Sequence, residues 1–272
     1  MRAMPLPAPA PDRTAIVTGA SAGIGVEIAK ELVARGHGVT LVARREERLR
    51  ELAATFTGVR VEVVPADLSD PEARRHVAAE VAARGLEPVV LVNNAGLSTA
   101  GPVHESDPER ELGMVAVDVE AVVHLCSLLL PGMVQRGRGA VLNVASTAAM
   151  QPIPGQAGYA AGKAFVLSYT RAIGAELRGT GVTATALCPG PVDTEFAAAT
   201  GWTQEQFESA LPKVLYVSAP DVARAGVDGL AAGKAVVIPG LGNRASSVLS
   251  KVVPHGLLMP LLVRQHPSLK GR

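Results

Sequence analysis

A hydroxyl, a phenol and an ammonium lie in one short stretch of this chain, at Ser146, Tyr159 and Lys163. If the segment from Gln156 is helical, Tyr159 and Lys163 stand one turn apart on the same face. A free phenol has a pKa of about 10 and is a poor acid or base near neutrality, but an adjacent ammonium favours the phenolate. The spacing therefore predicts that the pKa of Tyr159 is lowered toward the working pH, where proton transfer to a carbonyl oxygen is most useful.

A Tyr-x-x-x-Lys pair alone is common on helix surfaces, so the elements around it must decide its meaning. Near the N-terminus, the β-branched run Thr14–Thr18 has the composition of a buried parallel strand and leads into a glycine-rich turn and then a helical pattern. Glycines allow close approach of a pyrophosphate, and the N–H groups that begin a helix attract its charge. The sequence predicts a dinucleotide phosphate site formed by Gly19, Ser21, Ala22, Gly23, Ile24 and Gly25.

Strand and helix patterns alternate along the chain without an intervening linker or repeat. The expected strands cover residues 14–18, 39–43, 59–65, 89–93, 140–145, 182–188 and 235–239. This alternation predicts an α/β fold, a single doubly wound parallel sheet of about seven strands, Rossmann-like, with helices on both faces. Residues 13–240 would form this domain, and the Pro/Ala-rich residues 1–12 predict a disordered lead-in that is not a signal peptide.

The composition excludes several classes of function. The chain is 48% hydrophobic but only 3% aromatic, and its net charge is +1. These values argue against a nucleic-acid-binding surface, which needs a basic face or aromatic stacking platforms. Its six histidines show no ligand spacing, and we predict no metal site. Cys126 and Cys188 are expected to be buried thiols in a reducing cytoplasm. These features favour a cytoplasmic enzyme with a small-molecule substrate.

Over residues 13–240 the chain resembles the short-chain dehydrogenase/reductase family. Residues 18–25 match that family's cofactor turn, Asn-Asn-Ala-Gly at 93–96 matches the motif after its fourth strand, and residues 189–194 match the loop beside the nicotinamide. Ser146, Tyr159 and Lys163 match its catalytic residues. The resemblance implies hydride transfer between a nicotinamide cofactor and a carbonyl or secondary alcohol. Tyr159 would be the general acid or base, and Ser146 would bind the substrate oxygen.

The same resemblance assigns further cofactor contacts. Asp67 and Leu68 would flank the adenine, and Asn93, Ala95 and Gly96 would lie at the adenine-side ribose. Lys163 would hold the nicotinamide ribose as well as tune Tyr159. The loop residues Pro189, Gly190, Val192 and Thr194 would border the nicotinamide, with Thr194 and the Val192 backbone at its carboxamide.

The residues after the second expected strand favour NADP(H) over NAD(H). An NAD site usually places an acidic side chain there for the ribose hydroxyls, whereas an arginine accommodates a 2′-phosphate. This chain has Arg44 and Arg45, whose guanidinium groups suit a phosphate, and Ser21 in the glycine turn is expected to add a hydroxyl contact. The alternative is that both arginines simply begin a charged, solvent-exposed helix.

Asp118 is the one departure from the family pattern, which usually has asparagine at this position. That asparagine is thought to hold a water that relays protons to the lysine. A carboxylate at this position would keep the acceptor, lose the amide donor, and stabilise the Lys163 ammonium or shift the pH optimum. The alternative is that Asp118 lies on a helix surface. We expect Asp118→Asn to retain or raise turnover.

Substrate specificity is expected to come from residues 97–103, 147–155 and the segment after Thr194. That last segment gathers Phe196, Trp202, Phe207 and Leu211 in a chain with few aromatic residues. It suggests a lid over an apolar substrate, or else the ordinary packing of a short helix. The expected pocket walls contain few charges, which disfavours phosphorylated substrates.

Residues 241–272 form an apolar and basic extension beyond the last expected strand. Pro254 and Pro260 interrupt its apolar stretch, which is too short to span a bilayer. A lid or a subunit contact is favoured over membrane contact, because the basic flanks are modest. As in relatives, helices over residues 109–130 and 156–178 are expected to pair into a homodimer or homotetramer. A non-catalytic NADP-binding sensor or scaffold, and a peripheral membrane reductase of lipid-like carbonyls, remain as alternative functions.

Overall fold

The computed structural model describes residues 6–193, 212–253, 255–265 and 269. It confirms the predicted fold, a single seven-stranded parallel sheet in the order β3-β2-β1-β4-β5-β6-β7. The chain starts in the middle of the sheet at β1, winds outward to β3, and crosses back to β4, so the winding direction reverses between β1 and β4. The strands are β1 (Arg13–Thr18), β2 (Val39–Ala43), β3 (Val61–Pro65), β4 (Glu87–Asn93), β5 (Gly139–Val144), β6 (Val182–Leu187) and β7 (Val236–Val237).

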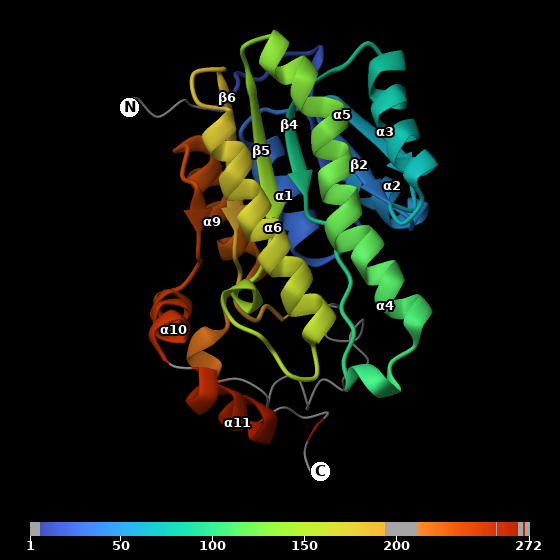
Figure 1. Cartoon of the computed structure of the whole chain (residues 1–272). Coiled ribbons are helices and arrows are strands. Elements are labelled where there is room, and N and C mark those ends of the chain that lie inside the picture. The colour runs from blue at the N-terminus through green and yellow to red at the C-terminus, as the bar shows by residue number, and fades with distance from the viewer. Residues whose placement is uncertain (1–5, 194–211, 254, 266–268, 270–272) are drawn as a thin grey trace.

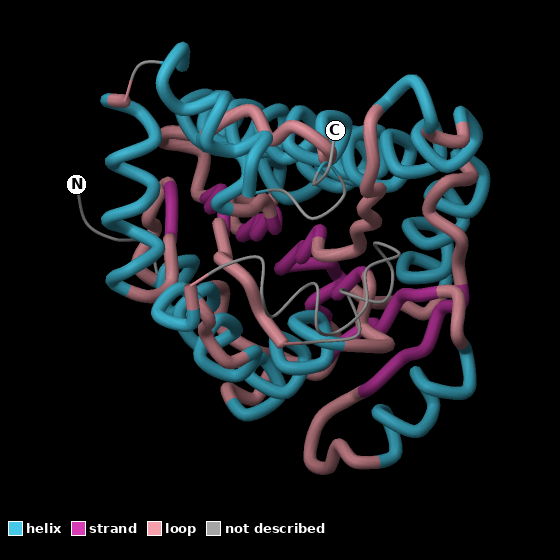
Figure 2. The backbone as a smooth tube through the Cα atoms, turned by 90° about the horizontal axis from the view of Figure 1, so that it is seen from below, coloured by secondary structure: helices cyan, strands magenta, loops and turns pink. Residues whose placement is uncertain are grey.

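Helices cover both faces of the sheet (Figures 1 and 2). One face carries α1 (Gly23–Ala34), α2 (Glu46–Ala54) and α9 (Ala219–Ala231). The other carries α3 (Pro71–Ala83), α4 (Pro108–Val115), α5 (Ala121–Gln135) and α6 (Ala157–Glu176). Short helical turns are η1 (Val103–Glu105), η2 (Ala116–Glu120), η3 (Thr147–Met150) and η4 (Lys213–Leu215), and the chain continues into α10 (Leu241–Val252) and α11 (His255–Gln265).

The interior consists of two aliphatic layers separated by the sheet. Ile28, Leu32 and Leu230 pack from α1 and α9 onto one face, and Leu125 and Met133 pack from α5 onto the other. The central strands are apolar on both faces, as expected for a parallel sheet covered by helices on each side. Each fully buried aliphatic side chain of this kind contributes about 1.5–3 kcal/mol to the free energy of unfolding.

The longest apolar helical stretch is part of this core. Residues Pro108–Gln135 have the length and composition of a membrane-crossing helix. In this fold the stretch comprises α4, η2 and α5, and α5 buries Leu125, Cys126 and Met133 against the sheet. We therefore interpret it as a core helix. A five-residue π-helical turn, η2, joins the two α-helical parts.

A chain of buried amide and hydroxyl groups fixes α6 to the middle of the sheet. The Asn93 side-chain amide on β4 donates to Asn143 Oδ1 on β5 at 2.8 Å. The Asn143 amide in turn donates to Thr170 Oγ1 on α6 at 2.9 Å, and Thr170 donates to the Val166 carbonyl at 2.6 Å. All three side chains are buried, and these hydrogen bonds offset the cost of placing their polar groups in the interior.

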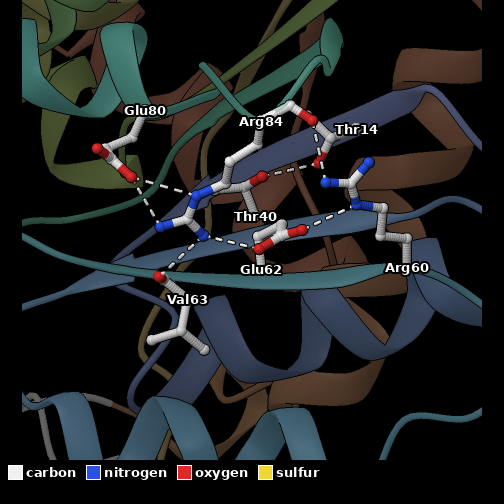
Figure 3. A network of polar contacts seen from close by, with 7 residues as sticks. All are labelled: Thr14, Thr40, Arg60, Glu62, Val63, Glu80 and Arg84. Carbon is white, nitrogen blue, oxygen red and sulfur yellow. Dashed lines mark hydrogen bonds and ion pairs between the residues drawn. The ribbon is translucent and has the colours of Figure 1, made fainter. Parts of the chain in front are cut away.

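A second polar network lies at the opposite end of the strands, where they begin. Figure 3 shows the Arg84 guanidinium between Glu80 and Glu62, with distances of 2.9 and 2.7 Å, while Arg60 binds Glu62 at 2.8 Å. In the same view the Thr14 and Thr40 hydroxyls of β1 and β2 lie 2.9 Å apart. The network attaches the edge strand β3 to the end of α3.

The structure refines two expectations about the chain termini and boundaries. Strand β3 begins at Val61 rather than at residue 59, and the turn that precedes it contains Gly58 in a left-handed conformation (φ 77°). Residues 6–12, part of the expected lead-in, lie against the domain. The Asp12 carbonyl accepts from the Glu87 N–H at 2.7 Å, and Leu6 packs on the core.

Candidate active site

The glycine turn leaves an uncapped helix N-terminus open at the end of β1. Helix α1 begins at Gly23, its N-cap residue Ala22 has no side-chain hydrogen bond, and its first turn contains no acidic residue. Gly19 and Gly23 have φ values of 65° and 56°, a region that favours glycine. The N–H groups that begin α1 therefore have no side-chain acceptor from its cap and attract an anion, as the sequence predicts.

Close backbone packing explains the third glycine of the motif. A Cβ on Gly25 would lie 2.3 Å from the Gly19 carbonyl oxygen and 2.5 Å from the Asn94 amide nitrogen. The Asn94 amide donates to the Thr18 carbonyl at 2.9 Å, and the Thr18 hydroxyl accepts from the Asn94 and Ala95 N–H groups. Asn94 thus joins the end of β4 to the glycine turn. The motif at 93–96 contains it, but sequence reasoning assigned it no role.

The two arginines after β2 have different neighbours. Arg45 donates to the Ser21 hydroxyl from Nε and Nη2, at 3.2 and 3.1 Å, which places its guanidinium beside the glycine turn. Arg44 lies 4.0 Å from Asp67, and both side chains are largely exposed. The Arg45 guanidinium and the Ser21 hydroxyl therefore lie together at the expected phosphate site. Asp67 also accepts from the Ser69 N–H and hydroxyl, and Leu68 is buried.

Ser146 follows β5 and caps the short helix η3. Its hydroxyl accepts from the Ala148 N–H at 3.1 Å and donates to the Pro189 carbonyl at 3.4 Å. The Thr147 N–H also donates to the Pro189 carbonyl, at 2.8 Å. The serine is thereby attached to the loop after β6 that contains Gly190 and Val192.

Tyr159 and Lys163 lie on the first turns of α6, as predicted, and the phenol hydrogen-bonds with Ser146. The Lys163 ammonium lies 5.7 Å from the centre of the Tyr159 ring. The expected lowering of the Tyr159 pKa is not present in the protein without a cofactor. Burial raises the pKa of Tyr159 above its ordinary value, the Lys163 cation and the Ser146 hydrogen bond only reduce that shift, and the Asp118 carboxylate adds to it.

Asp118 lies in the interior, which rules out a helix-surface position. Its Oδ2 is 2.9 Å from Lys163 Nζ, and its Oδ1 accepts from the Leu97 N–H at 2.7 Å. Lys163 also donates to the Val144 carbonyl at 3.2 Å. Burial alone would lower the pKa of Lys163, but the Asp118 and Tyr159 charges raise it above its ordinary value. The π-turn η2 places Asp118 in this interior position.

Of the remaining predicted site residues, some lie beside the glycine turn, one faces the core, and others lie outside the described residues. Ala95 and Gly96 follow β4 beside the glycine turn, and a Cβ on Gly96 would lie 3.1 Å from Lys163 Nζ. The side chain of Asn93 points into the core toward Asn143, so only its backbone is left for a cofactor. Thr194 and the expected lid residues Phe196, Trp202, Phe207 and Leu211 lie outside the described residues.

No group of three or more His, Cys, Asp or Glu side chains with the geometry of a metal site occurs among the described residues. Cys126 and Cys188 are both buried and form no disulfide. Burial raises the pKa of the Cys126 thiol to about 12, so this sulfur is not a nucleophile near neutral pH. The reactive groups of the site are therefore hydroxyl, phenol and ammonium groups.

Known proteins resemble this chain in both sequence and structure. A family model described as short chain dehydrogenase matches residues 13–205. The very-long-chain 3-oxoacyl-CoA reductase of Anas platyrhynchos is 31% identical over 267 residues, covering 95% of this chain and 81% of that protein. A putative ketoacyl reductase of Streptomyces coelicolor is 41% identical over 190 residues, covering 68% and 72%.

Among solved structures, a short-chain dehydrogenase from Sphingobium yanoikuyae in complex with NADPH superposes with a TM-score of 0.78. It is 29% identical and covers 92% of this chain and 95% of its own. The family match spans the glycine turn, the motif at 93–96 and the Ser146, Tyr159 and Lys163 cluster. The chain therefore belongs to the short-chain dehydrogenase family of oxidoreductases.

Proposed function

We propose that the protein is an NADP(H)-dependent reductase of a largely apolar carbonyl compound, working in reverse as an alcohol dehydrogenase. The observation that carries this proposal is the joining of Tyr159, Ser146 and Lys163 at the end of β5, next to the loop after β6. The residues fit a dinucleotide. Gly19 and Gly25 allow a tight turn where α1 begins, in which a Cβ would clash, and such a turn lets a pyrophosphate approach the N–H groups of the helix. Bound NADPH supplies the hydride.

In carbonyl reduction, the residues of the chain handle the developing charge on oxygen. Tyr159 donates its proton to that oxygen, and the raised pKa keeps the phenol protonated before the reaction. The Ser146 hydroxyl lies beside Tyr159 and gives a second hydrogen bond that strengthens as negative charge grows. Lys163 stabilises the phenolate that remains.

Lys163 is also positioned to bind a ribose. An ammonium has three donors, of which one points to the Val144 carbonyl and one to Asp118. The third is left for a ribose hydroxyl. The buried carboxylate of Asp118 orients the Lys163 ammonium. It also accepts from the Leu97 N–H and so holds the segment after β4 that borders the site.

We propose that the substrate is apolar. We also propose that the protein forms a homo-oligomer in the cytoplasm. Two relatives support the substrate class, since one is named a very-long-chain 3-oxoacyl-CoA reductase and the other a ketoacyl reductase. Oligomerisation through α4, α5 and α6 is supported by exposed apolar side chains on these helices, including Leu112, Leu128 and Phe165. Phe165 stacks on Tyr169 and extends this surface along α6.

A substrate panel with both cofactors tests the proposed reaction. We expect purified protein to oxidise NADPH in the presence of ketones with long apolar chains, and to show much lower activity with a phosphorylated ketone of similar size. Absorbance of the reduced cofactor measures the rate, and equilibrium dialysis measures cofactor binding. Binding of NADPH without turnover on any carbonyl compound would favour a sensor or scaffold over an enzyme.

Arg45 provides the test of cofactor choice. We expect Arg45→Ala to weaken NADPH binding by roughly 10- to 100-fold while changing NADH binding little, because a charge-assisted pair with the 2′-phosphate is lost. Fluorescence titration with each cofactor measures the two affinities. Arg50→Ala is the matched control, since Arg50 is exposed on α2, the helix that Arg45 precedes, and pairs with Glu46. An equal loss for both cofactors, or no loss for NADPH, contradicts this role.

A further inference from the structure

Helix α10 has its polar and apolar sides reversed relative to an ordinary surface helix. Asn243, Ser247 and Ser250 are buried, with exposed fractions of 2%, 4% and 7%. Leu241, Val248 and Leu249 are exposed, with fractions of 81%, 65% and 60%. At about 100° per residue, these two groups lie on opposite sides of the helix. Apolar side chains thus project into solvent at both ends of the stretch from Leu241 to Leu249.

Interior contacts fix this orientation. The Asn243 amide donates to the Leu215 carbonyl at 2.9 Å and to the Pro239 carbonyl at 3.0 Å. A Cβ on Gly190 would lie 2.2 Å from Asn243 Oδ1, so the helix is closely packed against the loop after β6. Turning the apolar side inward would break both hydrogen bonds and leave a buried amide without acceptors.

The exposed apolar surface continues from α10 onto the neighbouring turn η4. Val214 is 76% exposed, and its carbonyl oxygen lies 2.9 Å from the Cβ position of Gly242. We call Val214, Leu241, Val248 and Leu249 the outward apolar face. In Figure 1, α10 and α11 lie at the end of the molecule where α6 begins, which is also the end that carries Tyr159.

Basic side chains lie beside helix α10, which contributes Arg244 to their cluster. Arg171, Lys234 and Arg244 line a surface pocket of about 390 Å³ between α6, β7 and α10. No ion pair joins any of these three to an acidic side chain within the described part of the chain. Residues 241–272 contain no Asp or Glu and five basic residues, so they carry +5 although the whole chain carries +1.

We propose that the outward apolar face of α10 inserts into the surface of an anionic membrane, with Arg171, Lys234 and Arg244 at the lipid headgroups. An amphipathic helix with an apolar side and basic flanks binds such a surface by combining apolar burial with attraction to anionic lipid. The basic excess of the chain is concentrated in residues 241–272, since residues 1–240 carry a net −4.

A second copy of the chain is a poorer occupant of this face. Residues 241–272 contain no Asp or Glu, so this segment offers no acidic side chain to pair with the basic side chains of a second copy. The apolar surface proposed for subunit pairing lies elsewhere, on α4, α5 and α6. The binding proposed for α10 does not depend on the proposed reaction, since its measurement is lipid partition and not turnover.

Vesicle sedimentation with the full chain tests this inference. We expect the protein to pellet with vesicles of phosphatidylcholine and phosphatidylglycerol in equal parts, to pellet much less with phosphatidylcholine alone, and to be released by high salt. Leu241→Ser combined with Leu249→Ser should lower partition by roughly tenfold per residue. Arg171→Gln and Lys234→Gln should each lower it by about fivefold.

Leu112→Ser is the matched control, because Leu112 is 63% exposed but lies on α4. This variant should pellet with vesicles like the unchanged protein. The proposal is overturned if the unchanged protein stays in the supernatant with anionic vesicles, or if the Leu241/Leu249 variant pellets as well as the unchanged protein. It is also overturned if that variant dissociates a homo-oligomer in sedimentation velocity, because α10 would then be a subunit contact.

Discussion

Replacing Tyr159 by Phe is expected to lower the turnover number of carbonyl reduction by about 10²- to 10⁴-fold, the usual contribution of a positioned general acid. The ring stays in place on α6, but the proton donor and the hydrogen bond with Ser146 are lost. Steady-state rates of NADPH oxidation measure the change. The dissociation constant of NADPH should change little, because the proposed cofactor contacts come from Lys163 and the glycine turn.

Tyr169→Phe is the matched control for this substitution. Tyr169 is on the same helix, stacks on Phe165 at a centroid distance of 5.8 Å, and packs against the core rather than against Ser146. This variant should keep turnover within a few-fold of the unchanged protein. If Tyr159→Phe reduced ketones as fast as Tyr169→Phe does, the tyrosine would not be the acid and the proposed mechanism would be wrong.

Removal of the Asp118 carboxylate is expected to have the largest effect on stability. Asp118→Ala should lower the free energy of unfolding by about 3–5 kcal/mol, because the buried Lys163 ammonium loses its counter-ion and the Leu97 N–H loses its acceptor. Urea denaturation without cofactor measures this loss. Asp118→Asn should cost less, since its amide oxygen still accepts one of the two hydrogen bonds.

An exposed ion pair provides the comparison. Asp228 pairs with Arg35 at 2.6 Å, but its side chain is 60% exposed. Asp228→Ala should therefore cost only about 0–1 kcal/mol. A loss for Asp118→Ala no greater than the loss for Asp228→Ala would show that the buried pair does not hold the site together.

The Asp118→Asn variant also separates an electrostatic role from a merely structural one. The Asp118 carboxylate raises the pKa of both Tyr159 and Lys163, so its removal makes the first proton leave this pair at lower pH, whichever group loses it. Reduction needs the protonated phenol, so its loss of rate at high pH should begin at lower pH. Oxidation of the alcohol needs the phenolate, so its rise should also begin at lower pH.

Turnover of Asp118→Asn near neutral pH should stay within tenfold of the unchanged protein or exceed it. Identical pH profiles for the two proteins would contradict the electrostatic role. A loss of turnover of more than tenfold with the fold intact would show that the carboxylate has a role that an asparagine at this position cannot fill. Thermal unfolding monitored by circular dichroism verifies the fold in each case.

The fold was predictable because the local composition of each segment identifies most of the strands. Runs such as Val39–Ala43 are β-branched and apolar on both faces, a pattern that few structures other than a covered parallel strand can satisfy. Glycines before a helix indicated the phosphate turn for the same local reason. The ends of strand β7 were harder to predict: residues 235–239 were expected, but only Val236 and Val237 pair with β6.

Contacts between distant segments could not be predicted in this way. The burial of Asp118 depends on a π-turn, which no periodicity in the sequence reveals, and on the approach of α6. The pKa of Tyr159 depends on how far burial outweighs one cation, which requires coordinates. The buried side of α10 has polar residues because two backbone carbonyls satisfy Asn243, so a pattern normally exposed to solvent was turned inward.

The buried chain from Asn93 through Asn143 to Thr170 has a consequence for how specificity can change. Directional bonds hold α6 in one register on the sheet, whereas apolar packing alone would tolerate small shifts. The described residues that we expect to border the substrate, 97–103 and 147–155, lie outside this bonded chain. Evolution or engineering could therefore change these segments for new substrates without moving Tyr159, the proposed proton donor.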